Sequence, residues 1–330
     1  MSKTTMGWET WMQFAEQSAQ GTVGTTWYTY DTDAADSMGM NETPIERVGI
    51  TGNRTPHESS VRRGHYLPGG GLGPYPFAMG TDSQPLLLLL NNHFQGSSFG
   101  TGGGTTPCTY TFTPPATQID TGSYQYLSFQ KDTGLAGAGE QFLDCIINEL
   151  TGNWAVDSQY YTITPTDVKA LSAGTVSTIT GDGTSVTLGY YTTGDISFTW
   201  QGTTIYPTSF SWTSNNGIPE GQAASVRGRK RVSLGDFTGN LSMNMGRDED
   251  FDVWFVDQFG GGTAGTMVMS GTLPTSYGTL LGGEAIHFDH TFYADVMPPA
   301  QPTGQGEIID SVEFKLLDHS LAIPSDLDTL

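Results

Sequence analysis

The fold is decided by two matching segments, Phe142–Ile146 (FLDCI) and Ile308–Val312 (IIDSV), which lie 166 residues apart in a chain of 330 residues. Further matches follow in the same order at an offset of 165 or 166 residues. Among them are Ser60–Arg62 with Ser225–Arg227, Met79-Gly80 with Met245-Gly246, and Phe94 and Gly96 with Phe259 and Gly261. Self-similarity at a fixed offset is the signature of a duplicated structural unit. The sequence therefore predicts two copies of one domain, each about half of the chain.

The boundary between the copies is placed where the similarity is lost. From Gly152 onward the chain becomes rich in Thr and Ser and no longer matches its other half. We predict a first copy over residues 1–160, a linker or extra strands over residues 161–195, and a second copy over residues 196–330.

The pattern within each copy is mostly that of β-strands. Val312, Phe314 and Leu316 alternate with charged residues, which is the period-two pattern of a half-buried strand. Residues 209–212 alternate in the same way, and residues 227–243 are predicted to form a long hairpin.

One helix is predicted in each copy. In the first, Asp82 is expected to cap a helix that runs through Pro85 and Leu86–Leu90, and in the second, Asp248 or Asp250 is expected to start a helix over Phe251–Phe259. Acidic residues in the first turn are favoured by the helix dipole. The predicted fold class is mainly β, with two tandem repeat-related β-barrel or sandwich domains, each with one flanking α-helix.

The composition restricts the class of partner. The chain has 34 acidic and 13 basic residues, which gives a net charge of −21, and aromatic residues make up 11% of it. Disordered acidic chains lack aromatic residues, so a folded core is expected. Wrapping nucleic acid requires many Lys and Arg residues, whereas an acidic wall repels DNA and lets it pass without binding.

No targeting or membrane-spanning segment is predicted. The first residues contain one Lys and no apolar core of a signal peptide. The longest apolar run, Leu86–Leu90, is far shorter than the about 20 residues that span a bilayer. We expect a protein that is made in the cytoplasm and has no membrane partner.

The histidine and cysteine residues are the first candidates for a metal-binding or reactive site. His287 and Asp289 face one way on a strand and His290 the other, so this group is predicted to be structural and not a zinc site. Cys108 and Cys145 are expected to be reduced and partly buried.

The acidic and glycine-rich groups are likewise not predicted to form binding sites. Residues 248–252 lack the ligand order of a calcium loop, and the Gly-rich segment at residues 69–73 lacks the context of a phosphate-binding loop. Asp31, Asp33 and Asp36 leave open an ion bridge between subunits. No catalytic, cofactor-binding or metal-binding residue is predicted, and the chain is not expected to be an enzyme.

The basic residues are more informative. Eight of the 13 fall in two groups at corresponding positions of the repeat: Arg47, Arg54, Arg62 and Arg63, and then Arg227, Arg229, Lys230 and Arg231. Two positive patches on an acidic chain suggest self-association, and the alternative is a solvated hairpin edge whose charges block unwanted pairing. The candidate inter-subunit contacts are Arg62, Arg63, Arg227, Arg229, Lys230 and Arg231. Reversing the second group to Glu is predicted to weaken assembly more than folding.

The opening segment, from Gly7 to Thr25 (GWETWMQFAEQSAQGTVGT), resembles the start of the roughly 300-residue tail tube proteins of tailed bacteriophages. Three later segments also look like that family: residues 60–63 with the Gly-rich stretch after them, the helix that ends at residues 94–96, and the strand Phe142–Leu150. The tip at residues 67–76 is richer in Gly and Pro than the family pattern, and residues 154–193 match no part of it.

The resemblance implies a structural virion protein of the double-domain type. Tail tube proteins stack as rings around a DNA channel, and most carry one domain and form hexamers. With two domains in a chain, the resemblance implies trimeric rings with pseudo-sixfold symmetry in the virion tail. The implied partners are further copies of the chain, the tape measure protein and the tail terminator, and genomic DNA crosses the lumen without sequence-specific binding. No cofactor is implied.

Two other classes remain open. One is a different virion β-protein, such as a capsid decoration protein or a receptor-binding adhesin domain, which exposed Trp and Tyr side chains would favour. The other is a secreted enzyme or lectin, against which the lack of a signal peptide and of a catalytic set weighs.

Overall fold

The structure is a computed structural model in which residues 12–30, 36–39, 42–46, 61–80, 83–100, 105–117, 123–135, 138–176, 179, 188–221, 229–230, 232–246, 264–296 and 309–327 are described. The described chain is mainly β, with one α-helix, α1 (Gln84–Phe94), and the short 3-10 helices η4 (Thr193–Asp195), η5 (Thr275–Tyr277) and η6 (Leu281–Gly283). The strands are β1 (Met12–Glu16), β2 (Tyr28–Tyr30), β3 (Glu42–Glu46), β4 (Val61–Tyr66), β5 (Gly69–Gly70), β6 (Tyr75–Pro76), β7 (Ala78–Met79), β8 (Ser97–Gly100), β9 (Cys108–Phe112), β10 (Leu127–Leu135), β11 (Ala138–Ala155), β12 (Thr162–Lys169), β13 (Ser172–Val176), β14 (Gly189–Tyr190), β15 (Ile196–Trp200), β16 (Thr203–Ile205), β17 (Pro207–Asn215), β18 (Thr238–Gly246), β19 (Gly265–Thr272), β20 (His287–Val296) and β21 (Ile309–Ser325).

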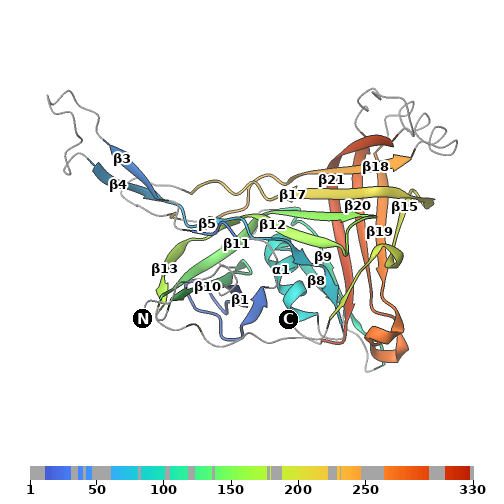
Figure 1. Ribbon diagram of the computed structural model, residues 1–330, viewed down its shortest axis with the longest axis horizontal. Coiled ribbons are helices and arrows are strands. Elements are labelled where there is room, and N and C mark those ends of the chain that lie inside the picture. Colours follow the sequence, from blue (N-terminus) through green and yellow to red (C-terminus); the bar gives the residue numbers. More distant parts are fainter. Residues whose placement is uncertain are drawn as a thin grey trace.

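Seventeen of these strands form one antiparallel sheet, and β3–β4 and β7–β14 form separate pairs. The order β12–β11–β17–β18–β21 runs across the molecule, and β21 then continues beside β20, β19 and β15 in a different direction (Figure 1). The pairs β11–β17 and β9–β21 join the two halves of the chain. Among the described residues we see one continuous sheet, and neither a closed barrel nor two separate repeated domains.

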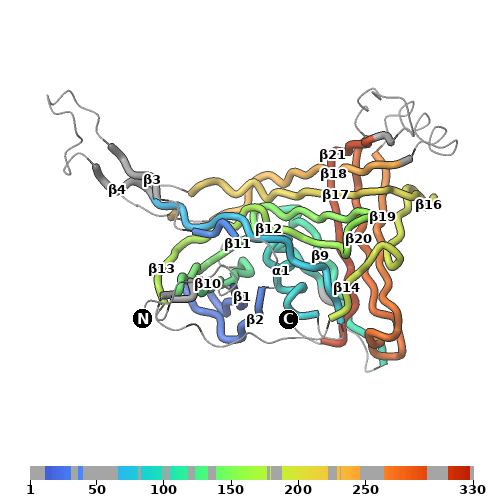
Figure 2. The backbone as a smooth tube through the Cα atoms, in the orientation of Figure 1, coloured from blue at the N-terminus to red at the C-terminus, as the bar shows by residue number. Residues whose placement is uncertain are grey.

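Two long strands let the sheet change direction. The first part of β11 lies between β10 and β13, and its second part lies between β12 and β17. In the same way β21 pairs first with β18, then with β20 and finally with β9. Figure 2 follows both strands from one part of the sheet into the other. A single strand that changes partners connects what would otherwise be two sheets.

The turning point of β11 is held by side chains from elsewhere. Asp144 has a positive φ of 53°, and its Oδ1 accepts a hydrogen bond from the Gly21 amide at 2.6 Å. The buried Asn92 side chain on α1 donates to the Cys145 carbonyl at 2.8 Å and accepts from the Ile147 amide at 2.8 Å. These bonds satisfy backbone groups that the irregular ladder leaves without a strand partner.

The helix α1 lies in the interior and not on a flank of the sheet. Every residue from Pro85 to Phe94 is buried, which is the behaviour of a helix that is apolar on all sides. The predicted helix is confirmed, but its flanking position is wrong, because α1 packs between β11 and β9 (Figure 1). The N-cap of the helix is Ser83 and its first turn has no acidic residue, so the predicted cap at Asp82 is also wrong.

The other local predictions have mixed outcomes. The alternation over residues 312–316 lies in β21, where Val312, Phe314 and Leu316 are buried, and residues 209–212 lie in β17. The segment Phe142–Leu150 lies within β11. Of the predicted hairpin, the second arm is β18, but residues 229, 230 and 232 of the first arm are not in a strand. The predicted second helix lies outside the described residues.

Residues 161–195, predicted to be a linker or extra strands, contain β12, β13, β14 and η4. β12 is a central strand, with β11 on one side and β5 and β6 on the other. β12 and β13 are therefore part of the large sheet, β14 pairs separately with β7, and all three lie against strands from the first half of the chain.

Candidate functional site

The most distinctive surface is the open face of five neighbouring strands, β12, β11, β17, β18 and β21. Phe210, Trp212, Leu241 and Phe314 are buried on the inner side of these strands. Because successive side chains in a strand point to opposite faces, the residues between them form the outer side. We call this outer side the polar face.

The polar face is built from rows of short polar side chains that the strand register places next to one another. One row is Asn153, Ser211, Ser242 and Glu313, and the next is Thr151, Thr213, Asn240 and Lys315. The flanking positions are Thr162, Thr164, Thr166, Glu149, Ala155, Ser209, Asn215, Thr238, Asn244 and Ser311. Lys315 is the basic residue in these rows, and Glu149 and Glu313 are the acidic ones. The surface is thus almost neutral, in a chain whose net charge is −21.

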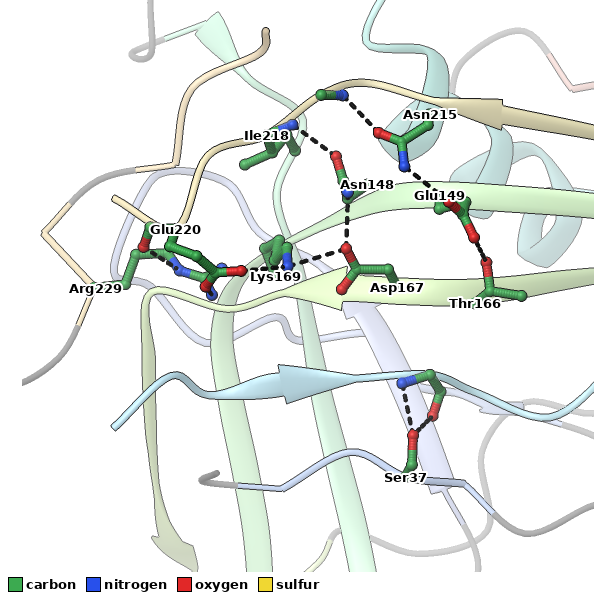
Figure 3. Close-up of polar contacts among 12 residues, drawn as sticks. Ser37, Asn148, Glu149, Thr166, Asp167, Lys169, Asn215, Ile218, Glu220 and Arg229 are labelled. Atoms are coloured by element: carbon green, nitrogen blue, oxygen red, sulfur yellow. Dashed lines mark hydrogen bonds and ion pairs between the residues drawn. The ribbon is translucent and has the colours of Figure 1, made fainter. Parts of the chain in front are cut away.

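Hydrogen bonds hold the short side chains of the polar face together. Thr151 and Thr213 hydroxyls lie 3.1 Å apart across β11 and β17. Glu149 accepts hydrogen bonds from the Asn215 amide at 2.8 Å and from the Thr166 hydroxyl at 2.6 Å (Figure 3). The face therefore presents hydroxyl and amide groups in fixed positions.

One end of the polar face carries a hollow and exposed aromatic residues. The hollow has a volume of about 660 Å³ and is lined by residues that include Trp154, Tyr160 and Asn244. Beside it, Tyr206 is 81% exposed and Val156 is 53% exposed, and the Val156 amide donates to the Thr208 carbonyl at 3.0 Å. Tyr190 is 42% exposed, and its ring lies 5.3 Å from that of Tyr160 in the lining of the hollow. We call Val156, Tyr190 and Tyr206 the end patch.

The hairpin β3–β4 projects from the opposite end of the molecule (Figure 1). Its two strands pair with each other and with no other described strand. The chain is pinched at its base, where Gly39 and Gly69 exchange backbone hydrogen bonds of 2.9 Å and 3.1 Å. We call residues 42–66 the arm. A two-stranded hairpin is at best marginally stable alone, so the arm requires a surface to pack on.

The structure separates the six candidate contact residues. Arg62 and Arg63 lie in β4 on the arm. Lys230 is exposed, and Arg227 and Arg231 lie outside the described residues. Arg229 is buried, with a side chain that is 2% exposed, so it is not offered to a neighbouring subunit.

Arg229 instead belongs to an ion-pair network within the chain (Figure 3). Its Nη2 lies 3.0 Å from Glu220 Oε2, and its Nε donates to the Glu220 carbonyl at 3.1 Å. The Lys169 ammonium lies 3.0 Å from both Glu220 and Asp167. Burial alone would raise the pKa of Glu220, but Lys169 and Arg229 lower it below its usual value. The network fastens the segment after β17 to the end of β12.

Other sequence candidates have structural roles. The predicted alternation in β20 is confirmed, since His290 is buried while His287 and Asp289 lie on the other side. Among the described residues, no group of three or more His, Cys, Asp or Glu is arranged to hold a metal ion. Cys108 and Cys145 form no disulfide, as predicted, and both are fully buried where partial burial was expected.

The Gly-rich segment forms β5, whose backbone runs against β12. A side chain at Gly69 would place its Cβ 2.1 Å from the Val168 carbonyl oxygen, and Gly69 has a φ of +142°. These glycines therefore allow a close approach of two backbones. Of the acidic cluster, Asp36 pairs with Lys131 at 2.8 Å, and Asp31 and Asp33 lie outside the described residues.

The polar face was not found from the sequence. Its signal is the alternation of Ser, Thr and Asn with apolar residues in residues 209–215 and 239–245, but a polar half of a strand gives no sign that five strands lie side by side. In the described part of the chain, no helix is long and apolar enough to cross a membrane. No known protein family matches this chain, and no curated protein matches it significantly.

Proposed function

We propose that this chain is the subunit of a phage tail tube, in which copies form stacked rings and turn their polar faces to a channel for genomic DNA. The observation that carries the proposal is the polar face itself. DNA carries one negative charge per about 1.7 Å of its axis, and a basic surface would hold it through the release of counterions. A wall of hydroxyl and amide groups with one lysine gives DNA no such hold.

The arm and the end patch supply a means of stacking. They lie at opposite ends of the molecule, since β15, which β16 and Tyr206 follow in the chain, lies at the end farthest from β3 and β4 (Figure 1). A contact between different surfaces of successive copies does not close on itself, and it grows a filament. The isolated hairpin and the exposed aromatic side chains would both become buried in such a contact.

The predicted duplication completes the proposal. Two repeat-related domains of the tail tube type in each chain would give rings of three chains with pseudo-sixfold symmetry. Such tubes would contact a tape measure protein within and a terminator at the end. This assignment places the protein in the virion tail and gives it no catalytic role.

The first test is assembly with and without the arm. We expect the purified chain at high concentration to form tubes with a regular axial repeat in negative stain and three chains per ring by cryo-electron microscopy. In the variant, Asn-Gly replaces residues 42–66. The two flanking segments can be joined by so short a turn because they already lie side by side, with backbone hydrogen bonds between Gly39 and Gly69. This variant is expected to keep its near-ultraviolet circular dichroism and to lose at least nine-tenths of the tubes that pellet. Undiminished tube yield without the arm, or rings of six chains with one domain facing the lumen, would contradict the proposal.

The second test is the location of the polar face in the tube. Ser211 lies in its middle row, and the native Cys108 and Cys145 are buried. A gold cluster attached to Ser211→Cys is therefore expected on the tube axis in electron micrographs, with little background from the wild-type chain. Gold on the outer wall would show that another surface lines the channel.

A second candidate is a receptor-binding adhesin domain. The hollow favours it, because an aromatic residue beside amide and hydroxyl groups is a common way to bind a sugar ring. Under this alternative the purified chain stays a discrete particle that binds glycans and never forms tubes. The assembly experiment therefore separates the two candidates.

A further inference from the structure

Three buried histidines lie close together where α1 packs against the two differently oriented parts of the sheet. His93 lies on α1, His290 on β20 and His319 on β21, and they are 1%, 0% and 2% exposed. Each comes from a different element, so contacts among them and their neighbours tie the helix to both parts of the sheet. The proposed function uses none of them.

The hydrogen bonds of His93 define its protonation. Its Nδ1 lies 3.1 Å from the Ile147 carbonyl oxygen, which can only accept, so Nδ1 carries the proton. Its Nε2 lies 2.6 Å from the Ser214 hydroxyl, which donates to it in the neutral ring. Burial lowers the pKa of His93 to about 4, although the bond to Ile147 acts in the opposite direction. A second proton on His93 would remove the acceptor that Ser214 uses.

His290 and His319 are paired with each other. His290 Nε2 lies 3.1 Å from His319 Nδ1, so one nitrogen donates and the other accepts. The remaining nitrogens, His290 Nδ1 and His319 Nε2, are buried without a hydrogen-bond partner. Even with both rings neutral, one of these two nitrogens carries a proton without an acceptor, and a further proton would make both of them unpaired donors and add a buried positive charge.

The surroundings of the pair are aromatic and uncharged. Trp212 and Phe292 lie 4.9 Å and 3.8 Å from the His290 ring, and Phe94 lies 4.7 Å from the His319 ring. The groups that act on the three pKa values include no carboxylate. Burial lowers the pKa of His290 and His319, and for His319 the other two histidines lower it further. The Asp318 carboxylate binds the backbone amide of His319 and not its ring.

A hollow lies on one side of the cluster, beyond the ring of Phe237. Phe237 is partly exposed and lies 5.4 Å from the His319 ring. It also lines a hollow of about 400 Å³, together with residues that include Pro115, Asn216 and Asp236. Movement of this one ring would bring water to the histidines without opening the rest of the core.

We propose that His93, His290 and His319 form an acid-sensitive lock that holds α1 to both parts of the sheet and opens when the histidines take up protons. In the folded state the three histidines are neutral and make the contacts described above. In the unfolded chain they take up protons below a pH of about 6.5. Stability is therefore fully present above that pH and falls as the pH drops toward about 4, where His93 itself titrates in the fold. Each histidine contributes about a tenfold change in the unfolding constant per pH unit.

The test is urea unfolding of the full chain between pH 8 and pH 4.5, followed by tryptophan fluorescence. Between pH 6 and pH 5 the unfolding constant of the wild type is expected to rise by up to about a thousandfold from the three histidines together. His93→Gln keeps an amide that can donate to Ile147, and it should reduce that rise by about tenfold. His287→Gln, on the same strand as His290 but partly exposed, is the control and should leave the pH dependence close to that of the wild type.

Parallel stability curves for wild type and His93→Gln would overturn the lock. Should that variant fail to fold, proton NMR of the wild-type imidazoles decides the matter, because the three rings must stay neutral in the folded chain over the whole range from pH 8 to pH 4.5. A ring of the three that titrates near pH 6.5 in the folded chain would also overturn it. The experiment uses unassembled protein, so its outcome is separate from tube formation.

Discussion

Replacing Gly152 by valine is expected to destabilise the chain by about 3 kcal/mol or more. Gly152 in β11 lies directly across from Trp212 in β17. A Cβ at Gly152 would lie 2.0 Å from Trp212 Nε1 and 2.7 Å from the Tyr161 hydroxyl, and both residues are buried. The indole would have to leave this position and lose its 2.8 Å hydrogen bond to Tyr161. The indole of Trp212, the largest core residue of β17, thus occupies the space that a side chain at position 152 would fill.

Urea denaturation measures this effect. With a slope of about 3 kcal/mol/M, a loss of that size lowers the midpoint by about 1 M. The matched control is Gly174→Ala in β13, where a Cβ meets no atom within 4 Å and stability is expected to change by about 0.5 kcal/mol at most. Equal midpoints for Gly152→Val and the wild type would mean that Trp212 does not pack over this glycine.

Reversing the charge of Arg229 is expected to cost about 3 kcal/mol, because it puts a carboxylate at a buried position and sets it against Glu220, whose own side chain is half exposed. The unfolding free energy from urea titration measures the loss. This expectation replaces the one drawn from the sequence, in which Arg229 reached a neighbouring subunit together with Arg227, Lys230 and Arg231. Reversal of all four would impair folding first, so it cannot report on assembly.

Lys230→Glu is the variant that isolates assembly. Lys230 is exposed and neighbours Arg229 in the chain, so its reversal should change the unfolding free energy by about 0.5 kcal/mol at most. If the basic group meets an acidic surface of the next copy, the same variant lowers the yield of pelleted tubes. Unchanged yield would remove Lys230 from the contact, while a loss of stability equal to that of Arg229→Glu would show that the two residues share one structural role.

Local pattern predicted several elements correctly. The alternation of Val312, Phe314 and Leu316 indicated the strand β21, and the apolar run Leu86–Leu90 indicated α1. Both signals arise because side-chain directions repeat every two residues in a strand and about every 3.6 residues in a helix. Such repeats can be recognised from residues that are close together in the chain. The same reasoning placed His290 opposite His287 and Asp289.

These local patterns did not predict where the elements and side chains lie relative to one another in the folded chain. The helix was expected on a flank, but Asn92 anchors it inside, against the turning point of β11. Arg229 looked like its exposed neighbour Lys230, yet it is buried because Glu220 and the end of β12 close over it. The histidine cluster also joins residues that are 29 and 226 positions apart in the chain, counted from His290 to His319 and from His93 to His319.

The sequence by itself determined several strand-forming segments, the helix-forming run Leu86–Leu90 and the acidic charge, since each depends on residues that are close together in the chain or on composition alone. Only the tertiary structure decided that β12, β11, β17, β18 and β21 lie side by side and join their neutral halves into the polar face. The reason is physical: alternation tells which side of a strand is buried, whereas the choice of neighbour depends on packing over the whole core and on the corners at β11 and β21.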